Sequence, residues 1–296
     1  MRRTRIGKRI ELTSRDIEIF RLLARYRYLS SAYIHVFVGG ASETRFKERL
    51  GDLFHEGYID RPERQWELAD CRHRPVIHEM GEGGRRVLDA HGIGVEPITW
   101  LRSGSHRQFA HSLMICELLA SIELGIRDRQ DLRFVAWPEI LAKAPSATRE
   151  STMPFRLLTA TPSGGVVPDG LFGIEYPASD RKAYRFFALE ADRGTMPVSR
   201  SNGQQSSFLD KVDAYHNLLL HRTYRAALGI PNLLVLTTTL SDSRALGIMQ
   251  RIGAEVGSNA FFLFKSATSA NLRSPAPELL SEPWGRAGLP ELRIDA

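Results

Sequence analysis

Two acidic clusters lie in stretches of the sequence that are typical of β-strands. The first cluster is Asp169 in a Pro-Asp-Gly segment, and the second is Glu190 with Asp192 in a Leu-Glu-Ala-Asp segment. A turn-rich stretch, 177–180, lies between them and predicts a β-hairpin that brings the two strands together. Carboxylates that converge from neighbouring strands are the ligands that Mg²⁺ prefers. The alternative is two unrelated solvated acids, and the choice between these two interpretations decides whether the chain is an enzyme.

The spacing within and after the second cluster supports convergence. Glu190 and Asp192 are two residues apart, so on a strand both side chains point to the same face. A helix is predicted over 207–224, and on it Lys211 and Tyr215 are four residues apart and therefore share a face. We interpret Lys211 as a source of positive charge for the acids, with a solvated helix face as the alternative.

Hydrophobic patterning after residue 100 alternates between strand-like and helix-like segments. This alternation predicts an α/β domain over 101–270 with a mixed central sheet. A Ser- and Thr-rich linker is expected over 144–153, and the Pro-rich stretch 271–296 is expected to be a C-terminal tail. The predicted elements are helices at 105–124, 207–224 and 242–253, and strands at 132–136, 155–159, 166–175, 184–191, 233–237 and 260–264.

The first hundred residues have a different pattern. Helices are predicted at 13–26, 30–38 and 42–56, with a two-glycine turn before the third, followed by strands at 58–61 and 76–80 and a helix that begins near residue 81. Three short helices followed by a β-hairpin resemble a winged helix-turn-helix domain, here over 12–100. Such domains bind double-stranded DNA, and the alternative is that this one contacts a protein.

The distribution of charge favours DNA as the partner. The net charge is +6, and residues 1–62 contain 13 Lys or Arg against 8 Asp or Glu. A basic arm over 1–11 suits a phosphate backbone, although a solubilising tail has the same composition. The candidate DNA-binding residues are Arg2, Arg3, Arg5, Arg45, Lys47, Arg49, Arg64, Arg72 and Arg74.

Composition excludes several classes of protein. Hydrophobic residues make up 43% of the 296 residues without an uninterrupted apolar run of 18, so we expect a cytoplasmic protein and no membrane span. The cysteines Cys71 and Cys116 fit a reduced protein, and the spacing of Cys71, His73 and His78 fits no zinc pattern. Neither a glycine-rich phosphate loop nor a nucleophile-elbow segment is present.

The order of helix, hairpin strands with Asp then Glu, helix, strand and helix resembles the PD-(D/E)xK restriction-endonuclease-like fold. The resemblance implies that Asp169 and Glu190 bind Mg²⁺. Asp192 stands where the family has its lysine, so we expect Lys211 to replace that lysine and Asp192 to be a further ligand. On the first helix of the domain, Glu117 is where some branches of the fold place another acidic ligand.

The whole layout from about 12 to 265 is similar to the replication-relaxation family of plasmids and other mobile elements. The similarity is carried by the winged helix, the Arg107-x-x-x-His111 helix, the Pro-Asp-Gly segment, the Glu-x-Asp-Arg-Gly-Thr segment that begins at Glu190, and Lys211-x-x-x-Tyr215. It implies a role in replication, relaxation or transfer of DNA.

Two kinds of function remain open at this stage. The first is a Mg²⁺-dependent endonuclease or nickase that uses Asp169, Glu190, Asp192 and Lys211. The second is a non-catalytic DNA-binding protein: either an accessory factor that recruits a relaxase, replication initiator or recombinase, or a transcriptional regulator. A homodimer would suit paired half-sites on the DNA.

Overall fold

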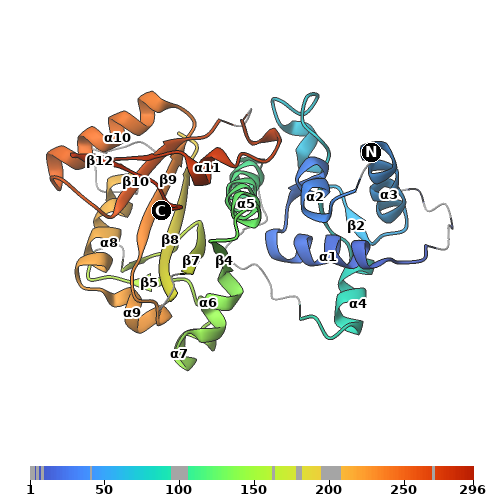
Figure 1. Cartoon of the computed structure of the whole chain (residues 1–296), viewed down its shortest axis with the longest axis horizontal. Coiled ribbons are helices and arrows are strands. Elements are labelled where there is room, and N and C mark those ends of the chain that lie inside the picture. The colour runs from blue at the N-terminus through green and yellow to red at the C-terminus, as the bar shows by residue number, and fades with distance from the viewer. Residues whose placement is uncertain are drawn as a thin grey trace. The chain divides into compact units, whose positions relative to one another are not determined.

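The chain forms two compact units. The computed structural model describes residues 4, 7, 10–40, 42–94, 106–161, 164–177, 182–194, 208–268 and 271–296. The N-terminal unit comprises residues 1–120 with 270–275, and the C-terminal unit comprises 121–269 with 276–296. Helix α5 (His106–Arg127) begins in the first unit and ends in the second (Figure 1).

The N-terminal unit has the element order that the sequence predicts. Thr13 caps the first helix in a reciprocal capping box, because its side chain accepts from the backbone of Asp16 while the Asp16 carboxylate accepts from the backbone of Thr13. Ser42 caps the third helix through Arg45 N. The elements are α1 (Ser14–Tyr26), β1 (Leu29–Ser30), α2 (Ser31–Val38), α3 (Glu43–His55), β2 (Ile59–Asp60), η1 (Glu63–Glu67), β3 (Ile77–Met80) and α4 (Glu82–Ala90).

A small antiparallel sheet completes this unit, with strand order β1-β3-β2. The hairpin strands β2 and β3 pair as predicted, with Ile59 opposite Met80. The sequence did not predict β1, which is only two residues long, or the 3-10 helix η1 inside the hairpin connection.

The C-terminal unit is built on a seven-stranded sheet of order β12-β11-β10-β9-β8-β7-β4. Strands β8, β9 and β10 are parallel to one another and the remaining pairs are antiparallel, so the mixed α/β fold that the sequence predicts is confirmed. A separate hairpin, β5-β6, lies outside this sheet. The elements are β4 (Arg133–Ala136), α6 (Trp137–Lys143), α7 (Ser146–Arg149), β5 (Leu157–Leu158), β6 (Gly165–Val166), β7 (Gly170–Pro177), β8 (Lys182–Asp192), α8 (Phe208–Leu220), α9 (Thr223–Leu228), β9 (Leu234–Thr239), α10 (Asp242–Glu255), β10 (Phe262–Ser266), η2 (Asn271–Arg273), α11 (Glu278–Ser281), β11 (Trp284–Arg286) and β12 (Leu289–Leu292).

Both faces of the sheet are buried at its central strand β8. Leu189 and Ala191 of β8 point to one face and Glu190 to the other, and all three are buried. Helices α8 and α10 cover the face that carries Glu190, and α5 lies on the opposite side (Figure 1). Acidic side chains on a buried strand face must find partners within the fold.

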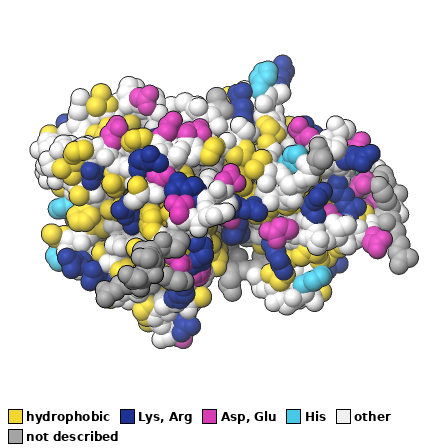
Figure 2. Space-filling model, viewed as in Figure 1, with side chains coloured by type: hydrophobic (Ala, Val, Ile, Leu, Met, Phe, Trp, Pro, Cys, Tyr) yellow, Lys and Arg dark blue, Asp and Glu magenta, His cyan; other side chains and the backbone are white. Residues whose placement is uncertain are grey.

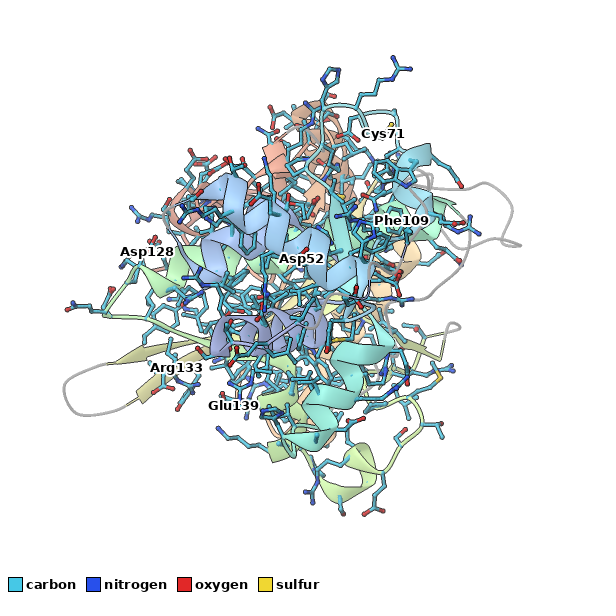
Figure 3. All side chains as sticks on the ribbon, turned by 90° about the vertical axis from the view of Figure 1, so that its right-hand side faces the viewer. Asp52, Cys71, Phe109, Asp128, Arg133 and Glu139 are labelled. Atoms are coloured by element: carbon cyan, nitrogen blue, oxygen red, sulfur yellow. The ribbon has the colours of Figure 1, made fainter. Side chains whose placement is uncertain are left out.

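The expected linker over 144–153 is partly helical. Helices α6 and α7 follow β4 directly, and Arg133 of β4 pairs with Glu139 of α6 and with Glu175 of β7. Figure 3 labels Arg133 and Glu139 side by side. The sequence prediction missed both helices because each is short, at seven and four residues.

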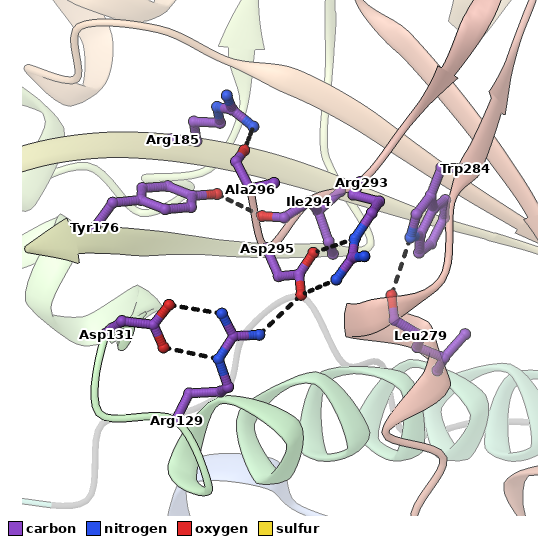
Figure 4. Close-up of polar contacts among 10 residues, drawn as sticks. All are labelled: Arg129, Asp131, Tyr176, Arg185, Leu279, Trp284, Arg293, Ile294, Asp295 and Ala296. Carbon is purple, nitrogen blue, oxygen red and sulfur yellow. Dashed lines mark hydrogen bonds and ion pairs between the residues drawn. The ribbon is translucent and has the colours of Figure 1, made fainter.

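The stretch 271–296 is not a tail, which corrects the sequence prediction. Its strands β11 and β12 extend the central sheet at one edge. Asp295, whose side chain is 1% exposed, accepts hydrogen bonds from Arg129 and Arg293 (Figure 4). The Tyr176 hydroxyl donates to the carbonyl of Ile294 in the same network. These contacts fix the segment to the sheet.

Helix α5 supplies much of the core. Its segment Gln108–Arg127 is long and apolar enough to cross a membrane by length and composition alone, yet nearly all of it is buried inside the fold. Burial of that kind is typical of the core helix of a globular domain.

Both Cys71 and Cys116 are free thiols.

Candidate functional site

The hairpin β7-β8 brings the two acidic clusters together. Gly170 pairs with Leu189, so the residue before β7, Asp169, lies next to Glu190. The Asp169 carboxylate accepts a hydrogen bond from the backbone N–H of Ala191 at 3.0 Å. The convergence of Asp169 and Glu190 that the sequence predicts is therefore present in the structure.

Two side chains of helix α8 contact Glu190. Lys211 Nζ lies 2.5 Å from Glu190 Oε2 and 3.9 Å from Asp169 Oδ1. The Tyr215 hydroxyl donates to Glu190 Oε1 at 2.6 Å. Because residues four apart on a helix share a face, one turn of α8 places both side chains over the strand. Lys211 is thus not on a solvated helix face, although 31% of its side chain remains exposed.

Burial controls the electrostatics of this cluster. The Glu190 side chain is 4% exposed, and burial raises its pKa to about 7 even though the charge of Lys211 acts in the opposite direction. Burial lowers the pKa of Lys211, but the charges of Glu190 and Asp169 outweigh it and the net shift is upward. A carboxyl group that titrates near neutrality beside a fixed cation is typical of functional sites.

Asp192 is held by a partner that the sequence did not reveal. It lies on the same strand face as Glu190, and Arg244 of α10 donates to both of its oxygens. The backbone N–H of Gly194 also donates to Asp192 at 3.0 Å. Nothing in the sequence signals the pairing of Arg244 with Asp192, because they are 52 positions apart and the contact depends on the packing of α10.

The donor set fits a divalent cation only in part. Among the described residues, no group of three or more His, Cys, Asp or Glu side chains is arranged to hold a metal ion. Asp169 and Glu190 suit a hydrated Mg²⁺, which proteins often bind through one or two carboxylates plus substrate phosphates. The ammonium of Lys211 lies beside both acids, so this position accepts positive charge. Asp192 does not fit as a ligand, since Arg244 occupies its oxygens.

A buried hydroxyl next to Glu190 has no hydrogen-bond partner within the described part of the chain. Thr237 of β9 is in register with Glu190, so its side chain points to the same face of the sheet. The residue is fully buried, and its Oγ1 is unsatisfied. An unmade buried hydrogen bond costs stability.

We expect Thr237→Val to raise the free energy of unfolding by about 1–2 kcal/mol, because valine has the same shape and no hydroxyl to desolvate. Urea denaturation measures this. Thr239→Val is the matched control, since Thr239 is equally buried but donates to the carbonyl of Ser241 at 2.8 Å, and it should lose about 1 kcal/mol. Equal losses in both variants would show that the Thr237 hydroxyl is satisfied.

The basic residues predicted for the N-terminal unit fall into three groups. Arg45, Lys47, Arg64 and Arg72 are exposed, and Lys47 pairs with Glu43 one helical turn away. Such a surface pair is weak enough to exchange for a phosphate. Arg2, Arg3 and Arg5 lie outside the described residues.

Arg49 and Arg74 have structural partners. Arg49 makes two hydrogen bonds to the carboxylate of Asp16, at 3.0 and 2.6 Å, and ties α3 to α1. Arg74 is 4% exposed and pairs with Glu117 at 2.5 Å and with Asp70 at 3.3 Å. Arg74 is therefore not part of an exposed basic hairpin, and Glu117 is held by Arg74 in the N-terminal unit.

Comparison with known proteins identifies a family for the chain. The sequence model that describes replication-relaxation proteins matches residues 20–233, which is more than half of the chain. The chain belongs to the replication-relaxation family. The match begins within α1 and includes α2, α3, the hairpin that carries Asp169 and Glu190, and helix α8 with Lys211. No curated protein and no solved structure matches the chain. Family membership supports a role in the replication or relaxation of plasmids or other mobile elements.

Proposed function

We propose that this chain is a cytoplasmic DNA-binding protein of a plasmid or other mobile element, and that its C-terminal unit nicks DNA in a Mg²⁺-dependent reaction. One observation carries the proposal. Asp169, Glu190, Lys211 and Tyr215 come from three separate segments and converge on one point of the sheet. Burying these charges together is costly, so a cluster of this kind supports a chemical role.

Each side chain has a distinct part in the proposed reaction. Asp169 and Glu190 would hold Mg²⁺, which supplies polarisation of the phosphate and activation of water. Lys211 stands where its charge can stabilise the negative charge that develops on a phosphate, and the Tyr215 hydroxyl fixes the rotamer of Glu190.

The exposed basic groups Arg45 and Lys47 on α3, with Arg64 and Arg72 in the hairpin connection, support DNA binding by the N-terminal unit. The arrangement of α2, α3 and the β2-β3 hairpin resembles a winged helix, in which the third helix enters the major groove. Double-stranded DNA is accordingly the proposed partner, together with a relaxase, replication initiator or recombinase acting at the same site.

A second candidate function is that of a non-catalytic accessory factor. The observation that favours it is that Lys211 and Arg244 already neutralise Glu190 and Asp192. In this alternative the nuclease-like unit is a scaffold, and the protein recruits another enzyme to bound DNA or forms a homodimer on paired half-sites.

Incubation of the purified protein with supercoiled plasmid from its host, with Mg²⁺, with Mn²⁺ and with EDTA, distinguishes the two. We expect metal-dependent conversion to open circles by the wild type and a loss of about 10²-fold or more in Glu190→Gln. The matched control is Asp213→Asn, which removes an exposed acid from α8 and should leave nicking intact. Retarded but uncut DNA in every metal supports the accessory factor instead.

A further inference from the structure

Helix α9 is the centre of a second basic surface, in the C-terminal unit. The Thr148 hydroxyl, from α7, donates to the carbonyl of Ala227 in α9 at 2.5 Å. The Thr223 hydroxyl, at the start of α9, donates to the carbonyl of Leu158 in β5 at 3.4 Å. These contacts bring two distant stretches of the chain, 143–160 and 217–231, onto one corner of the unit.

This corner is strongly positive. The two stretches contain five Lys or Arg and a single acid, Glu150, which is a net charge of +4 in a chain whose total is +6. Lys143, one of the five, pairs with Glu139 just before the first stretch, so the four arginines carry the charge that is not paired with a carboxylate. Arg149, Arg156, Arg222 and Arg225 are all exposed. Figure 2 shows Lys and Arg side chains over the part of this unit where Figure 1 labels α7 and α9. We call these four arginines the α9 patch.

The patch arginines differ in their partners from several other arginines of the unit, although Arg286, like Arg225, donates to a backbone carbonyl. Within the described part of the chain, none of the four forms an ion pair with a carboxylate, and Arg225 donates only to the carbonyl of Pro231. Elsewhere in the same unit, arginines are bound to acids; these are Arg129, Arg133, Arg244 and Arg293. The α9 patch therefore has guanidinium groups available for an external anion.

The backbone at Arg222 adds a second observation. Its φ is 54° and its ψ is 30°, the left-handed region that favours glycine or asparagine. Among the described residues of this unit, Arg222 is the one non-glycine residue with positive φ. Strained positions that keep a bulky charged residue are concentrated at functional sites.

We infer that the α9 patch is a DNA-binding surface that contacts the phosphate backbone independently of sequence. Guanidinium groups match phosphate geometry, and exposed guanidinium groups gathered on one surface attract a phosphodiester backbone. The inference rests on the DNA binding proposed above and extends it to the C-terminal unit. Contact there would hold the DNA on the unit that carries Asp169 and Glu190, while the N-terminal unit recognises its site.

The test measures binding of the full chain to a fluorescent duplex by anisotropy over a series of KCl concentrations. The variant Arg222→Gln/Arg225→Gln removes two patch charges. Arg127→Gln/Arg251→Gln removes the same amount of charge from exposed residues of α5 and α10 and is the control for net charge. We expect the patch variant to bind roughly tenfold or more weakly and its log–log salt slope to become shallower by about 0.9 per lost phosphate contact. Adding Arg149→Gln and Arg156→Gln should extend both effects.

The outcomes separate this inference from the proposed function. If the wild type binds but the patch and control variants lose the same affinity and the same salt slope, the α9 patch does not contact DNA. If the wild type fails to bind any duplex, the proposed function fails first, and the patch inference with it. The melting temperature of each variant is measured as well, and values close to that of the wild type show that the loss is one of binding and not of folding. If the Arg222→Gln/Arg225→Gln variant perturbs α9, Arg149→Gln/Arg156→Gln is the second patch variant.

Discussion

At pH 9, replacement of Arg74 by methionine is expected to lower the free energy of unfolding by about 3–5 kcal/mol. The Arg74 and Glu117 side chains are 4% and 2% exposed, and their ion pair spans the hairpin connection and α5. Removing the arginine leaves a buried carboxyl group without its cation, which is among the most destabilising single changes. Urea denaturation at pH 9, where the Glu117 carboxyl group of the wild type is ionised, measures the loss.

The loss should depend on pH in a defined direction. Burial raises the pKa of Glu117 to about 8 even with Arg74 beside it. A carboxyl group with a raised pKa favours folding while it is protonated, so its contribution is lost as the pH rises from about 4.5 through about 8. Without Arg74 the pKa rises further, and the destabilisation in Arg74→Met should be larger at pH 9 than at pH 6.

The double variant Arg74→Met/Glu117→Met is the control for this prediction. Apolar side chains of similar volume often replace a buried ion pair at little cost, so the double variant should recover most of the stability and lose the pH dependence. A single variant that costs less than about 1 kcal/mol would show that water or another group compensates Glu117.

The sequence predicts the parts of this fold that depend on local rules. Thr13 and Asp16 form a capping box because they are three positions apart, and Lys211 and Tyr215 share a face because they are four positions apart. The hairpin that joins Asp169 to Glu190 follows from two apolar strands around a turn. Because these rules are local, most residues of the candidate site can be predicted from the sequence.

The remaining features depend on tertiary packing that no local pattern encodes. The pairs Arg244–Asp192 and Arg74–Glu117 join residues 52 and 43 positions apart. Strand β12 contains Pro290, and proline is tolerated on an edge strand, so a stretch with the composition of a tail adds a strand to the sheet. Arg74 carries the same charge as the exposed arginines near it, and only its burial distinguishes it.

Replacement of Lys211 by methionine is expected to lower metal-dependent nicking by about 10²-fold or more. Lys211 is the cation between Asp169 and Glu190, and methionine keeps the length of the side chain without its charge. The pH profile should change as well. Nicking by the wild type should rise with pH through about 7 as Glu190 ionises, because an ionised carboxylate is needed to hold the metal. Lys211 lowers the pKa of Glu190, so the midpoint should move to higher pH in the variant.

Two matched changes identify the origin of this effect. Tyr215→Phe removes a neutral donor to Glu190 and leaves the charge in place, so it should reduce nicking less than Lys211→Met does and move the midpoint less. Lys211→Arg restores the charge with a different geometry and should recover part of the activity. Nicking in Lys211→Met at the wild-type rate and with the wild-type midpoint would exclude Lys211 from the reaction, and the cluster on α8 would then serve only to neutralise the buried acids of β8.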